Sequence, residues 1–235
     1  MARRVASPAS SSLTLQRVER SPEPGGAERL VLHTDAGGIA CRFHPAAAGD
    51  AAVLWVFGSG GGLGGPAGGV FTRLAGRLRE RDVASLELDY RHPGRLEPCV
   101  MDVLLGIAWL TGQGRARIVL VGHSFGGAVV IAAGAASEAV AAVAALSSQS
   151  AGTGAVGALS PRPALFAHGT EDEILPDACS RDLYARAGEP KQLVLYPGCR
   201  HGLDECRDRL DQDLTAWLDR VIADGARGPA PRSSG

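Results

Sequence analysis

The stretch RIVLVGHSFGGAVVIAA, residues 117–133, decides the fold class. Residues 117–121 are mostly apolar and predict a short strand buried on both faces, and residues 129–136 predict an apolar helix. Between them, Gly122-His123-Ser124-Phe125-Gly126 forms a G-x-S-x-G sequence. A chain that turns from strand to helix around one strained serine needs glycine two residues before and after it, because larger side chains would collide with the neighbouring elements. The stretch therefore predicts a serine hydroxyl presented at the edge of a sheet.

Short apolar runs on both sides of this stretch predict further buried strands. They cover residues 52–57, 84–88, 140–146, 164–167 and 192–196. Apolar residues at helical spacing occupy the gaps at 70–81, 97–110 and 203–222. This alternation predicts an α/β fold, a doubly wound and mostly parallel sheet with helices on both faces. Three further runs, at 13–18, 29–34 and 38–44, predict an antiparallel opening.

Length and composition fit one globular domain. The chain has 235 residues, of which 45% are hydrophobic and 21% charged. We expect the domain to span residues 13–222, between flexible tails at 1–12 and 223–235 that are rich in Ala, Gly, Pro and Ser. A net charge of −1 gives no reason to expect nucleic acid or an anionic membrane as a partner. No apolar run is long enough to predict a transmembrane helix.

The five cysteines are odd in number, scattered, and without CxxC spacing. This pattern predicts free thiols, Cys199 included, in a reduced cytoplasmic protein. The N-terminal residues carry Arg3 and Arg4 but no apolar segment of a secretory signal. Their Arg/Ser-rich composition leaves a transit peptide as the alternative to a simple tail.

A serine nucleophile needs a base, and the base needs an orienting acid. Downstream of Ser124, the strand at 164–167 runs into HGTEDE (168–173), and the strand at 192–196 runs into PGCRHG (197–202). Parallel strands end at the same sheet edge, so both polar loops are expected beside the serine. The order serine, acid, histidine predicts His201 as the base. The spacing leaves the acid open among the three carboxylates of residues 171–173.

From about residue 28 to residue 222 the chain resembles the small α/β-hydrolases related to dienelactone hydrolases and bacterial esterases. The matching segments are GHSFGG (122–127), HGTED (168–172) and PGCRHG (197–202). The resemblance implies an α/β-hydrolase fold, and it assigns the acid to Asp172, the last residue of H-G-x-x-D. It also implies that His123 faces away from the site and that His168 holds its own loop. Dienelactone hydrolases proper use a cysteine nucleophile where this chain has Ser124, so that particular activity is not implied.

Residues 58–69 contain eight glycines and follow a predicted strand. Such a loop lets backbone amides approach an anion closely. In a hydrolase it would supply an oxyanion donor from the amide of Ser59 or Gly60, beside the amide of Phe125. One donor of this kind contributes about 2.7–4 kcal/mol of transition-state stabilisation.

The same glycines fit the G-x-G-x-x-G pattern of a dinucleotide-binding oxidoreductase, with Asp89 as the acidic residue that follows. Two features favour the hydrolase instead. The next helix is expected near Val70, too late to place its N-terminus at a pyrophosphate. The oxidoreductase also leaves the serine turn and its two partners without a role.

The sequence thus predicts a serine hydrolase that acts on carboxylic esters, with Ser124, Asp172 and His201 as its triad. Thioesterase and peptidase or amidase activity use the same machinery and remain alternatives. A non-catalytic binding module is the third class. No metal or organic cofactor is expected. The span 147–163 is short and glycine-rich, so we expect neither a cap domain nor a lid helix, and a site open to small soluble substrates.

Overall fold

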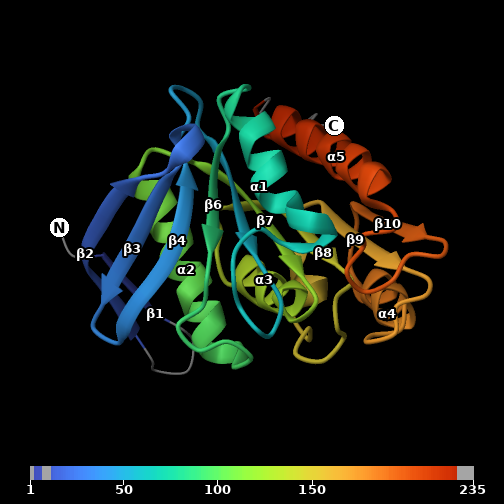
Figure 1. Cartoon of the computed structure of the whole chain (residues 1–235). Coiled ribbons are helices and arrows are strands. Elements are labelled where there is room, and N and C mark those ends of the chain that lie inside the picture. Colours follow the sequence, from blue (N-terminus) through green and yellow to red (C-terminus); the bar gives the residue numbers. More distant parts are fainter. Residues whose placement is uncertain (1–2, 7–11, 227–235) are drawn as a thin grey trace, which may run out of the picture.

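The computed structural model describes residues 3–6 and 12–226. Within these residues, ten strands form one sheet in the order β1-β2-β3-β4-β6-β5-β7-β8-β9-β10 (Figure 1). The strands are β1 (Arg3–Ala6), β2 (Ser12–Pro22), β3 (Glu28–Thr34), β4 (Gly37–His44), β5 (Ala51–Val56), β6 (Ala84–Leu88), β7 (Arg117–His123), β8 (Val140–Leu146), β9 (Ala164–Gly169) and β10 (Lys191–Tyr196). The helices are α1 (Pro66–Arg79), α2 (Leu96–Gly112), α3 (Phe125–Ala135), α4 (Ala178–Arg186) and α5 (Arg207–Ala226), with short 3-10 turns η1 (Pro24–Gly26) and η2 (Val156–Leu159).

The sheet is parallel from β6 to β10 and antiparallel from β1 to β4. Strand β4 joins the two parts by pairing antiparallel with β6. The predicted doubly wound α/β fold with an antiparallel opening is confirmed. Because β6, β5, β7, β8, β9 and β10 run in one direction, the loops that follow them gather at one edge of the sheet.

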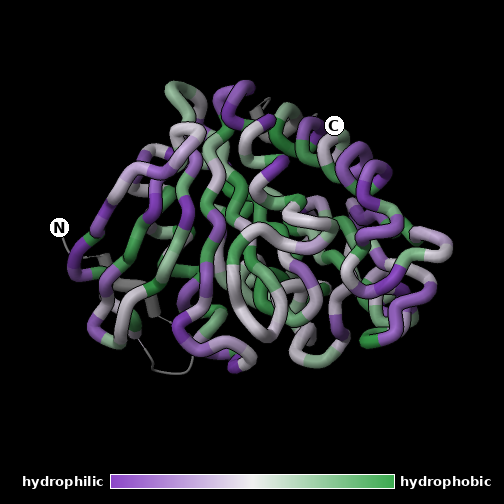
Figure 2. The backbone as a smooth tube through the Cα atoms, in the orientation of Figure 1, coloured by the Kyte–Doolittle hydropathy of each residue, from purple (hydrophilic) through white to green (hydrophobic). Residues whose placement is uncertain are grey.

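Alternate residues of the central strands pack against different helices. On β5, Val53 and Trp55 lie in the apolar cluster that contains α1 and α5. Their neighbours Leu54 and Val56 lie in the cluster that contains α2 and α3. The two-residue period of a strand thus buries both faces of the sheet. Figure 2 shows hydrophobic residues concentrated in the central strands and hydrophilic residues along the outer turns of α5.

The expected tails are partly structured. Residues 3–6 form β1 and pair with β2, so the prediction of a loose segment at 1–12 is wrong there. Residues 7–11 lie outside the described part of the chain. At the other end, α5 continues to Ala226, past the predicted boundary at 222, and residues 227–235 are again outside the described part.

Four helices differ from expectation, and two of them, α1 and α3, begin four residues before their predicted starts at residues 70 and 129. The short, polar α4 was not predicted, because it buries only Ser180 and Leu183 and shows little apolar periodicity. Helix α5 begins four residues later than the apolar pattern indicates. Leu203 fits that pattern and is fully buried, but it has a positive φ of 59° and belongs to the preceding loop. Among the helices of the described residues, none is long and apolar enough to span a bilayer.

Candidate active site

Ser124 occupies the sharp turn between β7 and α3. Its φ of 57° lies in the left-handed region, where a non-glycine residue is strained. A Cβ at Gly122 would collide with the carbonyl oxygen of Gly126, and a Cβ at Gly126 would collide with that of Phe57. The turn therefore requires glycine at both positions, which is the steric reason for the G-x-S-x-G sequence.

The structure brings the three predicted triad residues together from three loops. The Oγ of Ser124 lies 3.0 Å from Nε2 of His201. The Nδ1 of His201 lies 2.7 Å from Oδ2 of Asp172. A carboxylate only accepts, so Nδ1 carries the hydrogen, and Nε2 of the neutral ring is left to accept from the serine hydroxyl. This arrangement can take a proton from Ser124.

Asp172 is held as a carboxylate. Its side chain is 0% exposed, and Oδ1 accepts hydrogen bonds from the amides of Ile174 and Leu175, both at 2.8 Å. Burial opposes ionisation, but these amide bonds and the bond to His201 outweigh it, so the pKa of Asp172 lies below its usual value. Glu173 reaches only the main-chain amide of His201, at 3.3 Å. Among the acidic residues at 171–173, Asp172 is thus the one whose carboxylate contacts the imidazole of His201.

A second histidine, His168, also contacts the carboxylate of Asp172. The Nε2 of His168 donates to the carbonyl oxygen of Leu175 and lies 3.0 Å from Oδ2 of Asp172. Its Nδ1 lies 2.7 Å from Oγ of Ser180, which is buried on α4. Burial lowers the pKa of His168, so the ring is neutral at neutral pH. His168 holds its own loop as expected, and it also contacts the carboxylate of Asp172.

His123 does not face away from the site, contrary to what the resemblance implied. Its Nε2 donates to the main-chain oxygen of His201 at 2.9 Å, and the two imidazole rings are 4.9 Å apart. The ring is buried, and burial lowers its pKa to about 4. A neutral His123 therefore joins the serine turn to the loop that carries the base.

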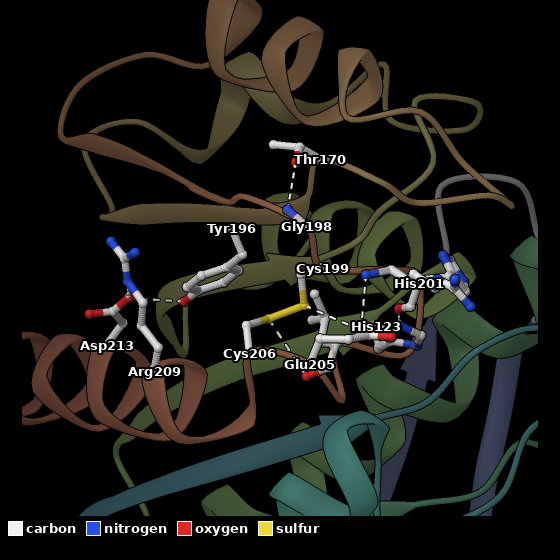
Figure 3. Close-up of a disulfide and its surroundings, with 12 residues drawn as sticks. His123, Thr170, Tyr196, Gly198, Cys199, His201, Glu205, Cys206, Arg209 and Asp213 are labelled. Atoms are coloured by element: carbon white, nitrogen blue, oxygen red, sulfur yellow. Dashed lines mark hydrogen bonds and ion pairs between the residues drawn. A yellow bond between two sulfur atoms is a disulfide. The ribbon is translucent and has the colours of Figure 1, made fainter.

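The loop of the base is also closed by a disulfide. Cys199 and Cys206 form a disulfide on either side of His201, so the expectation of five free thiols is wrong for this pair (Figure 3). Cys199 is fully buried, and its carbonyl oxygen accepts from the amide of Glu171 in the loop of the acid. The amide of Arg200 donates to Oε2 of Glu205 across the closed loop. The sequence signal that could have predicted this disulfide is the pair of cysteines, seven positions apart, that flank His201.

The amide of Phe125 adjoins Ser124, and the loop that carries the other predicted oxyanion donors starts beside Ser124. Phe125 opens α3, so its N–H has no helical acceptor. Gly58 lies close to the nucleophile: a Cβ built on it would be 3.6 Å from Cβ of Ser124. The amides of Ser59 and Gly60 follow in a turn closed by a bond from Gly61 N to Gly58 O, and within the described residues neither donates to a protein atom.

The glycine loop is not arranged as a dinucleotide site. The carboxylate of Asp89 accepts from the amide of Gly62 at 2.7 Å, so one of its two oxygens binds this loop. The first residues of α1, Ala67 to Gly69, have positive φ values, and the helix becomes regular only at Val70. No regular helix N-terminus therefore faces the glycines.

The span 147–163 carries no lid helix. It contains only the short turn η2, whose Val156 and Leu159 are buried against the protein. Over residues 3–6 and 12–226, no group of three His, Cys, Asp or Glu side chains is arranged to hold a metal ion.

A family model described as "Dienelactone hydrolase family" matches residues 83–219, more than half of the chain. Among curated proteins, the uncharacterized protein YfhR of Escherichia coli K12 is 40% identical over 58 residues. That match covers 25% of this chain and 20% of YfhR, so the chain aligns with only a fifth of this relative's length.

Solved structures share the fold at low identity. The dienelactone hydrolase from Anabaena variabilis superposes with a TM-score of 0.70 at 17% identity, covering 87% of this chain and 99% of that one. Est1E from Butyrivibrio proteoclasticus gives 0.69 at 17% identity, with 83% and 99% covered. The α/β hydrolase GrgF from Penicillium sp. sh18 gives 0.64 at 16% identity, with 87% and 97% covered.

Proposed function

The chain belongs to the dienelactone hydrolase family, and within this family of α/β-hydrolases we propose that it cleaves carboxylic esters through a serine acyl-enzyme. The observation that carries the proposal is the continuous series of contacts from Ser124 Oγ to His201 Nε2 at 3.0 Å and from His201 Nδ1 to Asp172 Oδ2 at 2.7 Å. This series supports proton removal from Ser124 by His201, with Asp172 as the group that orients the ring.

In the first half-reaction, Ser124 Oγ attacks the ester carbonyl carbon and its proton passes to Nε2 of His201. The tetrahedral oxyanion accepts hydrogen bonds from the amides of Phe125 and of Ser59 or Gly60. The carbon–oxygen bond to the alcohol then breaks, and the alcohol leaves with the proton from His201. Asp172 remains a carboxylate throughout and stabilises the imidazolium.

In the second half-reaction, water attacks the acyl carbon while His201 accepts the water proton. The acid is released as the bond to Ser124 breaks, and Ser124 recovers its proton. The absence of a lid helix over span 147–163 supports small soluble esters as substrates rather than aggregated lipid. The net charge of −1 gives no reason to propose nucleic acid or an anionic membrane as a partner. A cytoplasmic location is a separate proposal, and the Cys199–Cys206 disulfide counts against it, because such bonds are rare in reducing compartments. Recovery of active protein only outside the cytosol after fractionation would contradict it.

The experiment is a panel of p-nitrophenyl esters of increasing acyl length, assayed with wild type, Ser124→Ala and Ser21→Ala. Ser21 is an exposed serine on β2 and serves as the matched control. We expect ester turnover in wild type and Ser21→Ala and a loss of about 10⁶-fold in Ser124→Ala. Thioester and anilide analogues in the same panel separate the alternative activities. No turnover of any substrate would favour a non-catalytic binding module.

The acid is tested by substituting each carboxylate of its loop. Asp172→Asn should lower kcat about 10⁴-fold, because an amide at this position favours the wrong tautomer of His201. Glu171→Gln and Glu173→Gln should stay near wild type, since neither carboxylate contacts the imidazole. If Glu173→Gln proved the more damaging change, the assignment of Asp172 would be wrong.

A further inference from the structure

Two carboxylates at the end of β6 bind the glycine loop that starts beside the nucleophile. Asp89 Oδ1 accepts from the amide of Gly62 at 2.7 Å. Glu87 Oε2 accepts from the amide of Gly64 at 2.6 Å. Strands β5 and β6 are parallel neighbours, so the loop that follows β5 starts beside the end of β6, and the two hydrogen bonds hold it there. We infer that Glu87 and Asp89 are positioning residues that fix this loop, and with it the oxyanion-binding amides.

The inference rests on the proposed function, and the first step is that the loop cannot order itself. Residues 58–65 include six glycines, and Gly62 and Gly64 have positive φ values of 97° and 91°. Glycine has the largest conformational freedom to lose on ordering. Inside the loop, the bond from Gly61 N to Gly58 O closes one turn, so the position of that turn over the sheet depends on hydrogen bonds from outside the loop.

The second step is where those bonds come from. Glu87 is buried, and besides Gly64 it accepts from Thr72 of α1, at 3.0 Å, and lies 2.9 Å from Nε2 of His44 on β4. Both carboxylate oxygens are thus satisfied by rigid elements and by the loop. A buried carboxylate is costly unless fully hydrogen-bonded, and an apolar residue would be the cheaper core choice. Arg42 of β4 also lies 3.8 Å from Oε2, and the one loop group among these partners is the amide of Gly64, so Glu87 links the glycine loop to β4 and α1.

The third step is the path from these carboxylates to the reaction centre. At one end the loop leaves β5, and the hydroxyl of Tyr90 donates to the carbonyl oxygen of Phe57 at 3.2 Å. At the other end Asp89 binds Gly62. The three residues between Gly58 and Gly62 include Ser59 and Gly60, whose amides have no acceptor among the described residues. Fixing both ends aims these amides, and releasing Gly62 frees them.

Asp89 offers the cleaner test, because it is only partly buried while Glu87 lies in the core. Removing one oxyanion donor lowers kcat about 10²–10³-fold in serine enzymes, and a loosened donor should cost somewhat less. We expect Asp89→Ala to lower kcat for p-nitrophenyl acetate about 10–100-fold with KM within about twofold. Asp89→Asn keeps an acceptor oxygen and should stay within a few-fold of wild type.

Inhibition by an alkylboronic acid distinguishes a role in positioning the oxyanion-binding amides from a purely structural role. Ser124 Oγ adds to the trigonal boron, its proton passes to His201, and the tetrahedral boronate carries an oxygen in the oxyanion position. For Asp89→Ala, Ki for the boronate should rise by the same factor as kcat falls. Amide hydrogen exchange over residues 58–65 should also quicken. Asp219→Ala, an exposed carboxylate on α5 paired with Arg81, is the control and should leave all three quantities unchanged.

An active wild type whose Asp89→Ala variant keeps its kcat and its boronate affinity overturns this inference alone. The same holds if Asp89→Asn is as damaged as Asp89→Ala, since the hydrogen bond would then not be the relevant contact. A wild type that neither hydrolyses esters nor binds the boronate overturns the proposed function and this inference with it.

Discussion

The imidazole of His123 donates from Nε2 to the main-chain oxygen of His201, 2.9 Å away. The residue beside the nucleophile thus holds the backbone of the residue that would activate it. The His123 ring packs between Phe57 and His201, at centroid distances of 5.3 and 4.9 Å. Its Nδ1 is buried without a hydrogen-bond partner among the described residues, a cost of about 1–3 kcal/mol. The protein bears that cost at the contact between the serine turn and the base loop.

Replacing His123 by Phe keeps an aromatic ring but removes the donor to His201. We expect kcat for p-nitrophenyl acetate to fall about tenfold, which is the order of one hydrogen bond, because the base loop gains freedom relative to Ser124. His123→Gln retains an N–H donor and should recover part of the loss. Equal kcat in His123→Phe and wild type would show that this bond does not position the base.

The two buried histidines make stability depend on pH. Burial lowers the pKa of both His123 and His168, so the folded protein holds them neutral while the unfolded chain binds protons near pH 6.5. Stability is therefore full above about pH 6.5 and is lost as the pH falls below it. His123 contributes a slope of about 1.4 kcal/mol per pH unit down to about pH 4, and His168 adds a loss of stability in the same direction.

Urea unfolding at several pH values between 4 and 7.5 measures this slope. His123→Phe should reduce the slope of the unfolding free energy against pH by the contribution of one proton, because the variant has one titrating group fewer. An unfolding free energy that stays constant between pH 7 and pH 5 in the wild type would contradict neutral burial of these rings.

Breaking the Cys199–Cys206 disulfide should lower activity as well as stability. A closed loop of this length stabilises the fold by about 2 kcal/mol, chiefly by restricting the unfolded chain. The loop carries His201, so the double variant Cys199→Ser/Cys206→Ser should lose kcat as well as melting temperature. Dithiothreitol should reproduce the loss in wild type and change nothing in the double variant. Cys179→Ser, a free and partly exposed thiol, is the control. Unchanged kcat in the double variant would separate the disulfide from catalysis.

An open site predicts simple saturation. Without a lid helix in span 147–163, no conformational change is required at a lipid surface. Rates with esters of increasing chain length should follow hyperbolic curves through the solubility limit of each ester. A sharp rise in rate on emulsified triglyceride would indicate interfacial activation and refute the open site.

Local patterns predicted much of this protein, because their causes are local. The spacing of Gly122 and Gly126 follows from the steric requirement of one turn. The ends of the predicted strands at 164–167 and 192–196 indicated which loops meet Ser124. The choice of Asp172 needed the family resemblance, since three adjacent carboxylates look alike in sequence. The contact of His123 with His201 depends on tertiary packing between residues 78 positions apart, which periodicity does not encode. Strand β1 and the polar helix α4 likewise form through their tertiary partners rather than through apolar spacing.

The most direct test of Ser124 as nucleophile is to map where a fluorophosphonate attaches. In this reaction Ser124 Oγ bonds to phosphorus, fluoride leaves, and His201 takes the proton. We predict one adduct per chain by intact mass, on the peptide that contains Ser124, in wild type and Ser21→Ala. Ser124→Ala should carry no adduct. An adduct on any other residue of the wild type, or undiminished labelling of Ser124→Ala, would contradict the assignment of the nucleophile.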